Sequence, residues 1–258
     1  MTTTADKQRS ASPSAAVDLH CHILPGLDDG ARDVDDALAM ARTAQADGIA
    51  AICATPHIRH DHDVPIAELP ARRAELEAAI AQDGCSTRIL PGGEVAASAA
   101  TTLDDHELAA VSLGAAGRWI LLEPSPGPLS DALDTVVEEL AARGFRALIA
   151  HPERHPAPDL VPRLRRLVAR GALVQATAAF LTDETTRPGM TALAREGVLH
   201  VLGSDSHSSR AGRPVVLTPA LEVLRSVPAA GAQLDWIARV APEAIVGGLE
   251  LQPPFPAH

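Results

Sequence analysis

The feature that most constrains the fold of this chain is an alternation of short apolar runs with amphipathic stretches of helix length. The runs are typical of buried strands and cover residues 16–19, 49–54, 87–90, 118–123, 147–150, 172–177 and 198–203. Helices are predicted at 33–48, 65–84, 130–144, 159–171 and 187–197, each ending in a glycine that suits a helix C-terminus. Because no repeat or linker interrupts the pattern, the sequence predicts an α/β domain built as a parallel barrel.

An open, doubly wound α/β sheet is the alternative architecture. Such sheets bind nucleotides through a glycine-rich loop after the first strand. No G-x-G-x-x-G motif follows residues 16–19, and no Walker A motif occurs anywhere in the chain. The barrel is therefore favoured.

The length of 258 residues fits one large domain. We expect a disordered leader at 1–15, a single barrel domain at 16–250 and a short tail at 251–258. Hydrophobic residues make up 46% of the chain but aromatic residues only 2%, so the core must consist mainly of Ala, Val, Leu and Ile.

The net charge of −11 argues against non-specific binding to nucleic acid or to an anionic membrane. An anionic substrate would need a local positive centre, such as a metal ion or an arginine. The three cysteines are an odd number without the spacing of a disulfide framework. The N-terminal residues lack the apolar core of a signal peptide, and no run is long enough to span a bilayer, so a cytoplasmic protein is expected.

Imidazole or carboxylate groups follow six of the seven predicted strands, and only the strand that ends in "QAT" lacks one. These groups belong to His20, His22, His57, Glu94, Glu123, His151, Asp205 and His207. In a parallel barrel all such strand ends lie on one face, where the loops build the active site. His20 and His22 are two residues apart on a strand end, so their side chains point to the same side and can bind one metal ion.

Mixed nitrogen and oxygen ligands fit divalent ions such as Mn²⁺, Fe²⁺ or Zn²⁺. The candidates outnumber the four ligands of a structural zinc site, which indicates two or three ions. A centre of this kind makes hydroxide at neutral pH and binds the oxygens of a transferred phosphoryl group.

The segments "DLHCHILPGLDDGA", "ATPH", "GGEV", "LLE", "HPER" and "GSDSH", in this order, resemble the polymerase-and-histidinol-phosphatase (PHP) family. The first of them is similar to that of its bacterial branch of metal-dependent protein-tyrosine phosphatases, the CpsB/YwqE type. The resemblance extends over residues 17–215. It implies a distorted, TIM-like (β/α)7 barrel with a trinuclear centre that usually holds manganese, iron and zinc being the alternatives.

The resemblance also implies a set of site residues. The metal ligands would be His20, His22, Asp29, His57, Glu94, Glu123, His151, Asp205 and His207, with Glu94 bridging ions. Glu94 and Asp205 would take part in catalysis, and Arg154 with Arg210 or Arg213 would bind phosphate. Asp28 fits a turn or a supporting role better than a ligand. The segment "VQATAAFL" departs from the expected "QxTAxSLxG", which leaves one wall of the pocket undefined.

The implied activity is hydrolysis of phosphotyrosine on a protein by in-line attack of a metal-bridging hydroxide. The implied partner is a bacterial tyrosine autokinase of capsule or exopolysaccharide production, and homo-oligomer formation is left open. One alternative is a small-molecule phosphatase of the histidinol-phosphatase type, which would differ in pocket width. Another is a non-catalytic barrel in a larger assembly, which an intact ligand set disfavours.

A thiol mechanism is a further alternative, because Cys53 and Arg59 have the C-x5-R spacing of cysteine-dependent tyrosine phosphatases. The loop between them contains no glycine, and Pro56 lacks the N–H group that such a loop directs at phosphate. The remaining histidines, His60, His62, His106, His155, His200 and His258, are interpreted as surface or packing residues. His60 and His62 are in a loop at the mouth, where substrate contact stays open.

Overall fold

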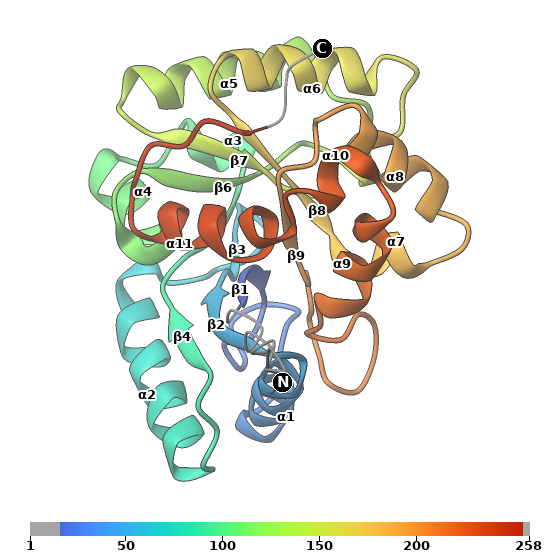
Figure 1. The fold of residues 1–258 in the computed structure, drawn as a ribbon. Coiled ribbons are helices and arrows are strands. Elements are labelled where there is room, and N and C mark those ends of the chain that lie inside the picture. Colours follow the sequence, from blue (N-terminus) through green and yellow to red (C-terminus); the bar gives the residue numbers. More distant parts are fainter. Residues whose placement is uncertain (1–15, 255–258) are drawn as a thin grey trace, which may run out of the picture.

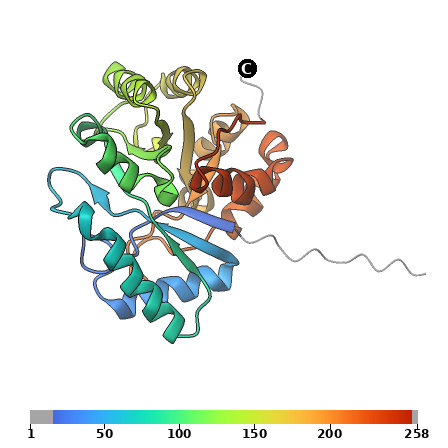
Figure 2. The ribbon, with the colours of Figure 1, turned by 90° about the vertical axis from the view of Figure 1, so that its left-hand side faces the viewer.

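The computed structural model describes residues 16–254. The predicted leader and the last four residues of the predicted tail lie outside this range. Figure 1 shows strands in the interior and helices around them, and Figure 2 shows the same arrangement from the side.

All strand pairs are parallel and form two sheets, with strand orders β1-β2-β4 and β3-β5-β6-β7-β8-β9. The strands are β1 (Ala16–Cys21), β2 (Ile49–Ala54), β3 (His57–Ile58), β4 (Arg88–Leu90), β5 (Glu94–Ala96), β6 (Trp119–Glu123), β7 (Arg146–Ile149), β8 (Leu173–Thr177) and β9 (Val201–Gly203). Each of the seven predicted runs overlaps a strand. The last begins at Val201, three residues later than expected.

Two of the strand regions are each split into two strands by a few residues that are not in strand conformation. Thr55 and Pro56 separate β2 from β3, and the sequence Pro91-Gly92-Gly93 separates β4 from β5. Pro56 cannot donate a ladder hydrogen bond, but its carbonyl accepts one from the N–H of Glu94 at 3.0 Å. These breaks divide the curled sheet into two parts without changing the order of the strands around it.

The carboxyl ends of the first and last strands are joined by backbone hydrogen bonds. Asp205 N donates to His20 O at 2.8 Å, and His22 N donates to Ser206 O at 2.9 Å. The predicted distorted, TIM-like barrel is thus confirmed as a curled parallel sheet, and the doubly wound alternative is wrong.

The five predicted helices are present as α1 (Val34–Asp47), α2 (Leu69–Gln82), α5 (Asp131–Ala142), α6 (Leu160–Ala169) and α8 (Arg187–Arg195). The structure adds shorter helices: α3 (Ala97–Ala100), α4 (Asp105–Val111), α7 (Ala178–Thr182), α9 (Thr218–Arg225), α10 (Pro228–Gly231) and α11 (Ala241–Val246). It also contains the 3₁₀ turns η1 (Ile66–Glu68), η2 (Leu113–Ala115) and η3 (Pro152–Arg154) and the π-helical turn η4 (Trp236–Val240). In the described part of the chain, no helix is both long and apolar enough to cross a membrane.

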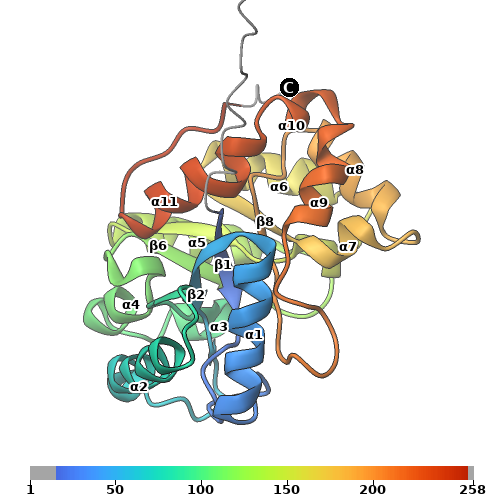
Figure 3. The ribbon, with the colours of Figure 1, turned by 60° about the horizontal axis from the view of Figure 1, so that its bottom comes forward.

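One end of the barrel is filled by a compact apolar cluster. Leu19, Leu121 and Leu148 belong to it, and Ala241 and Ile245 of α11 pack against them. Figure 3 shows α11 near the start of β1. Since this end is closed by apolar packing, the polar groups at the carboxyl ends of the strands can form a separate layer at the opposite end.

Candidate metal centre

The end of β1 directs two imidazole rings toward each other. His20 and His22 lie with their Nε2 atoms 3.2 Å apart, and both side chains are fully buried. His20 Nδ1 donates to Gln175 Oε1 at 3.0 Å, and His22 Nδ1 donates to Asp28 Oδ2 at 2.7 Å. Because the Nδ1 atoms are held in this way, the two Nε2 atoms are available to bind a metal ion.

Asp28 supports this arrangement from outside. Its Oδ1 accepts a hydrogen bond from Gly30 N, and its Oδ2 accepts a second one from His57 N at 2.9 Å. Burial acts to raise the pKa of Asp28, but His22 and these backbone donors hold that pKa well below its usual range. The geometry fits the supporting role expected of Asp28.

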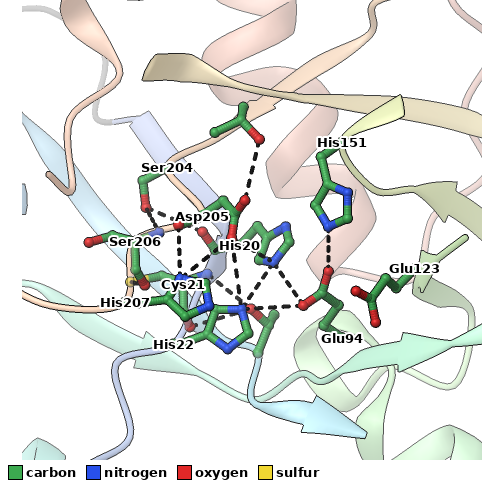
Figure 4. A network of polar contacts seen from close by, with 12 residues as sticks. His20, Cys21, His22, Glu94, Glu123, His151, Ser204, Asp205, Ser206 and His207 are labelled. Atoms are coloured by element: carbon green, nitrogen blue, oxygen red, sulfur yellow. Dashed lines mark hydrogen bonds and ion pairs between the residues drawn. The ribbon is translucent and has the colours of Figure 1, made fainter. Parts of the chain in front are cut away.

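Glu94, at the start of β5, lies at the centre of the site. Its Oε2 is 3.3 Å from Nε2 of both His20 and His22 and 3.0 Å from His57 Nδ1. Its Oε1 accepts a hydrogen bond from His151 Nε2 at 2.7 Å. Figure 4 shows this carboxylate between His151 on one side and the pair of β1 histidines on the other.

The charges around Glu94 compensate one another. Burial acts to raise the pKa of Glu94, but His20 and hydrogen bonds from the imidazoles keep it well below its usual range. Burial in turn acts to lower the pKa of His22, whereas Asp28 and Glu94 raise it to about 10. The carboxylate and the imidazoles thus favour each other's charged forms. A divalent cation would supply the positive charge in this position, because metal ligands bind in their deprotonated forms.

Three groups of side chains bring their ligand atoms within 4.8 Å of one another. They are His20, His22 and Glu94; His57, Glu94 and Glu123; and His22, Asp29, His57 and His207. The second and third groups share His57, and the first two share Glu94.

One buried nitrogen atom, His57 Nδ1, belongs to a residue shared by two of these groups and indicates that they suit a metal ion. His57 Nδ1 is 3.0 Å from Glu94 Oε2, yet it makes no hydrogen bond to any group in the described residues. A buried nitrogen that faces a carboxylate oxygen without a shared proton suits two ligands of a common ion. The residues present therefore fit a centre of divalent ions.

Asp205 connects this cluster to two arginines. Its Oδ1 lies 3.6 Å from His20 Nε2, while its Oδ2 pairs with Arg154 and lies 3.1 Å from Arg213 Nη2. Burial acts to raise the pKa of Asp205, but His20, Arg154 and Arg213 lower it. Arg154 does not pair with Glu153, whose carboxylate accepts a hydrogen bond from Thr177 N at 2.7 Å.

A pocket of about 540 Å³ opens over these groups. Arg154 and Arg213 line it, as do His57, Glu123 and His207. Arg210 does not line it and lies 3.4 Å from Asp33 at the surface. Of the two arginines left open by the sequence, the structure thus brings Arg213 to the site.

The groups of the thiol alternative are arranged differently. Cys53 is fully buried in the apolar cluster at the closed end, and burial raises the pKa of its thiol. Arg59 forms two hydrogen bonds with Asp61 and lines the pocket. Because the thiol is neither exposed nor acidic, it is not placed to attack a substrate.

The other histidines mostly follow the interpretation given above. His155 and His200 are buried: His155 Nδ1 donates to Gly127 O, and His200 Nδ1 accepts from Val174 N. His60 and His106 are exposed. His62 lies against His57, with ring centroids 5.0 Å apart. His258 is outside the described residues.

Sequence reasoning missed two buried polar residues within strands. Gln175 of β8 accepts the hydrogen bond from His20, although this strand showed no ligand. Asp18 of β1 accepts hydrogen bonds from His20 N at 3.2 Å and Ser204 N at 3.0 Å. The available signal was the presence of Asp18 inside the apolar run "AVDL" and of Gln175 inside "ALVQAT".

Comparison with known proteins places this geometry in a family. A family model described as "Capsular polysaccharide synthesis, CpsB/CapC" matches residues 16–233. The chain belongs to the CpsB/CapC family. Among its relatives, the tyrosine-protein phosphatase YwqE of Bacillus subtilis is 31% identical over 199 residues, covering 74% of this chain and 77% of YwqE. CapC of Staphylococcus aureus is 26% identical over 208 residues, covering 78% of this chain and 80% of CapC.

Solved structures agree with this membership of the CpsB/CapC family. A crystal structure from work on YwqE of Bacillus subtilis and CpsB of Streptococcus pneumoniae, described as unique metal-dependent tyrosine phosphatases, has a TM-score of 0.78. It is 27% identical and covers 94% of this chain and 99% of that chain. The phosphotriesterase homology protein of Escherichia coli, at 12% identity and a TM-score of 0.59, covers 92% of this chain and 100% of that chain and shares the fold. The resemblance to CpsB/YwqE-type proteins is confirmed.

Proposed function

We propose that this protein is a metal-dependent phosphatase that hydrolyses phosphotyrosine on proteins. The observation that carries the proposal is the convergence of four imidazoles on the buried carboxylate of Glu94, next to a pocket lined by arginines. Its family membership and the activity of its relative YwqE support the same reaction.

The proposed centre holds two or three divalent ions, with Mn²⁺ as the physiological metal. Such ions supply a hydroxide nucleophile at neutral pH and neutralise charge on the phosphoryl oxygens. The residues that would hold them are His20, His22, Asp29, His57, Glu94, Glu123, His151, Asp205 and His207. Glu94 would bridge ions because both of its oxygens face imidazole nitrogens.

Arg154 and Arg213 would bind the phosphoryl group of the substrate. Both guanidinium groups now meet Asp205, and they line the pocket from the side of that carboxylate. A guanidinium can bind two phosphate oxygens at once, which orients the phosphorus for in-line attack. Tyrosinate has a pKa near 10, so it leaves without a strong general acid.

The proposed partner is a phosphorylated tyrosine autokinase of capsule or exopolysaccharide production. The proposed location of this reaction is the cytoplasm. The support is the family's link to capsular polysaccharide synthesis and the tyrosine phosphatase activity of YwqE. A single catalytic domain at residues 16–250 would be sufficient for this activity.

The deciding assay compares a phosphotyrosyl peptide with histidinol phosphate for the manganese-loaded protein. We expect kcat/KM to be at least about a hundredfold higher for the peptide, a difference of about 2.7 kcal/mol in transition-state binding. Equal or better turnover of histidinol phosphate would point to a metabolite phosphatase. No turnover of either substrate with any divalent ion would refute a phosphatase function.

A further inference from the structure

Most of the residues that line the pocket over the metal site carry charged or titratable side chains, and one is aromatic. Of the nine residues that line it, seven carry charged or titratable side chains, and Gly212 has no side chain. Phe180 is the remaining one, and it is thus the sole apolar side chain among the described lining residues. A phenyl ring thus stands among charged side chains, in a chain that contains only three phenylalanines.

The fold holds Phe180 firmly at this position. It lies in the short helix α7, which begins directly after β8, and its half-buried ring packs partly against the hydrophobic core. Thr186 Oγ1 donates to Phe180 O at 2.6 Å, and Arg187 Nε donates to the next carbonyl, Leu181 O, at 3.1 Å. These two hydrogen bonds fix the backbone around Phe180, and the exposed part of its ring lines the pocket.

Phe180 also marks the place where the chain departs from the pattern expected for this segment. In "VQATAAFL" the phenylalanine stands where "QxTAxSLxG" has serine. A serine hydroxyl would add one more polar group to the pocket, whereas the phenyl ring adds an apolar face.

We propose that Phe180 forms the face against which the aromatic ring of the substrate stacks, so that it selects aryl over alkyl phosphates. This inference rests on the proposed function and deepens it. With the phosphoryl group held near Arg154 and Arg213, the ring of phosphotyrosine would extend through a pocket that offers it one apolar side chain. Aromatic pairs gain from contact between ring faces and edges as well as from burial.

The test uses binding of phosphonates, which does not depend on turnover. Phenylphosphonate and methylphosphonate are titrated calorimetrically into the manganese-loaded full chain, as wild type, Phe180→Leu and Phe180→Ala. We expect the wild type to prefer phenylphosphonate, Phe180→Ala to weaken that ligand roughly 5- to 15-fold, and Phe180→Leu to weaken it less. Methylphosphonate binding should change less than about twofold in every variant, because it has no ring to stack.

Val168→Ala serves as the matched control, because Val168 is also half-buried against the core but lies in α6 and lines no described pocket. It should leave both affinities unchanged. If Phe180→Ala does not fold, Phe180→Leu carries the comparison. An equal loss for both phosphonates, or a wild type without preference for the phenyl ligand, would overturn the inference.

The phosphatase assay separates this inference from the proposed function. If the wild type hydrolyses phosphotyrosyl peptide and Phe180→Ala raises KM for it with little change in kcat, both stand. If the peptide is hydrolysed but KM is unaffected, only the stacking role fails. If no phosphate ester is hydrolysed while the phenylphosphonate preference depends on Phe180, the reaction is wrong but the aryl-binding face remains.

Discussion

His151 and Asp205 both have backbone conformations that are uncommon for residues with a side chain. Their φ angles are 29° and 50°, and each follows the end of a barrel strand. Such conformations cost about 1–3 kcal/mol each and persist where the surrounding structure fixes them. Here they accompany the contacts of His151 with Glu94 and of Asp205 with two arginines. Strain at these two residues is thus located where the proposed chemistry takes place.

Arg154→Lys tests the proposed phosphate contact. Lysine keeps the positive charge but cannot bind two oxygens in one plane, so about 1.5–3 kcal/mol of transition-state stabilisation should be lost. This corresponds to a fall of roughly ten- to a hundredfold in kcat/KM at unchanged metal content. Arg210→Lys is the control, because Arg210 lies outside the pocket. Equal kinetics for the two variants would leave Arg154 as a structural partner of Asp205.

Glu153 gives a prediction for stability against pH in the metal-free protein. Burial raises the pKa of this carboxyl group from 4.5 to about 7. The folded state therefore retains a proton that the unfolded chain releases, and the free energy of unfolding should fall as pH rises from about 4.5 to 7. A difference of 2.5 pH units corresponds to about 3 kcal/mol.

Denaturant unfolding of Glu153→Gln at several pH values checks this expectation. Glutamine keeps an oxygen that can accept from Thr177 N but carries no proton to lose, so the variant should lack that part of the pH slope. Glu184→Gln, in an exposed position, should keep the slope of the wild type. A slope unchanged by Glu153→Gln would show that this group does not titrate in that range.

At the level of elements, the loop between β1 and α1 packs closely against the site. A Cβ added at Gly30 would lie 2.2 Å from His22 O and 2.8 Å from Asp28 Oδ1. Position 30 requires glycine because the loop folds back against His22, leaving no room for a Cβ atom. The same loop places Asp28 against His22 Nδ1.

Gly30→Ala should therefore displace Asp28 and weaken metal binding. We expect a loss of about 1–3 kcal/mol in stability from overpacking and a clear fall in metal affinity, measured by titration with Mn²⁺. Gly189→Ala in α8 is the control, because an added Cβ there meets no atom within 4 Å. Unchanged metal affinity in Gly30→Ala would mean that Asp28 does not hold His22 for binding.

The long elements could be predicted from the sequence because they repeat a simple pattern. Helix α1, for example, ends at Asp47 and is capped by Gly48, whose φ of 87° suits glycine, and the next strand follows at once. Helices of four to seven residues, such as α3, α7 and α11, are too short to show a period and are fixed by tertiary packing. They include α7, which carries Phe180, so this wall of the pocket could not be predicted.

Across the whole molecule, the candidate ligands were predictable because a parallel barrel brings strand ends to one face. His20, Glu94 and His151 come from distant parts of the sequence, and the strand order alone places them together. The supporting residues Gln175 and Asp18 were not predicted, since their roles depend on which neighbour each strand meets. The pairing of Arg213 with Asp205 depends on the path of one loop, which no sequence period specifies.

The location of the cysteines in the whole fold leads to a prediction about mechanism. Cys53 is buried in the apolar cluster at the closed end of the barrel, whereas the arginines that would bind phosphate line the pocket. Cys53→Ser should keep phosphatase activity within about threefold of the wild type, while a chelator abolishes activity in both and Mn²⁺ restores it. An inactive Cys53→Ser protein with full metal content would instead support thiol chemistry.

The most direct measurement of the central claim is anomalous diffraction at the manganese edge from crystals of the manganese-loaded protein. We expect anomalous peaks within the three groups of ligand atoms, and Glu94 should lie next to the peaks of the two groups to which it belongs. A protein that hydrolyses phosphotyrosyl peptide but shows no anomalous peak within these groups would contradict it.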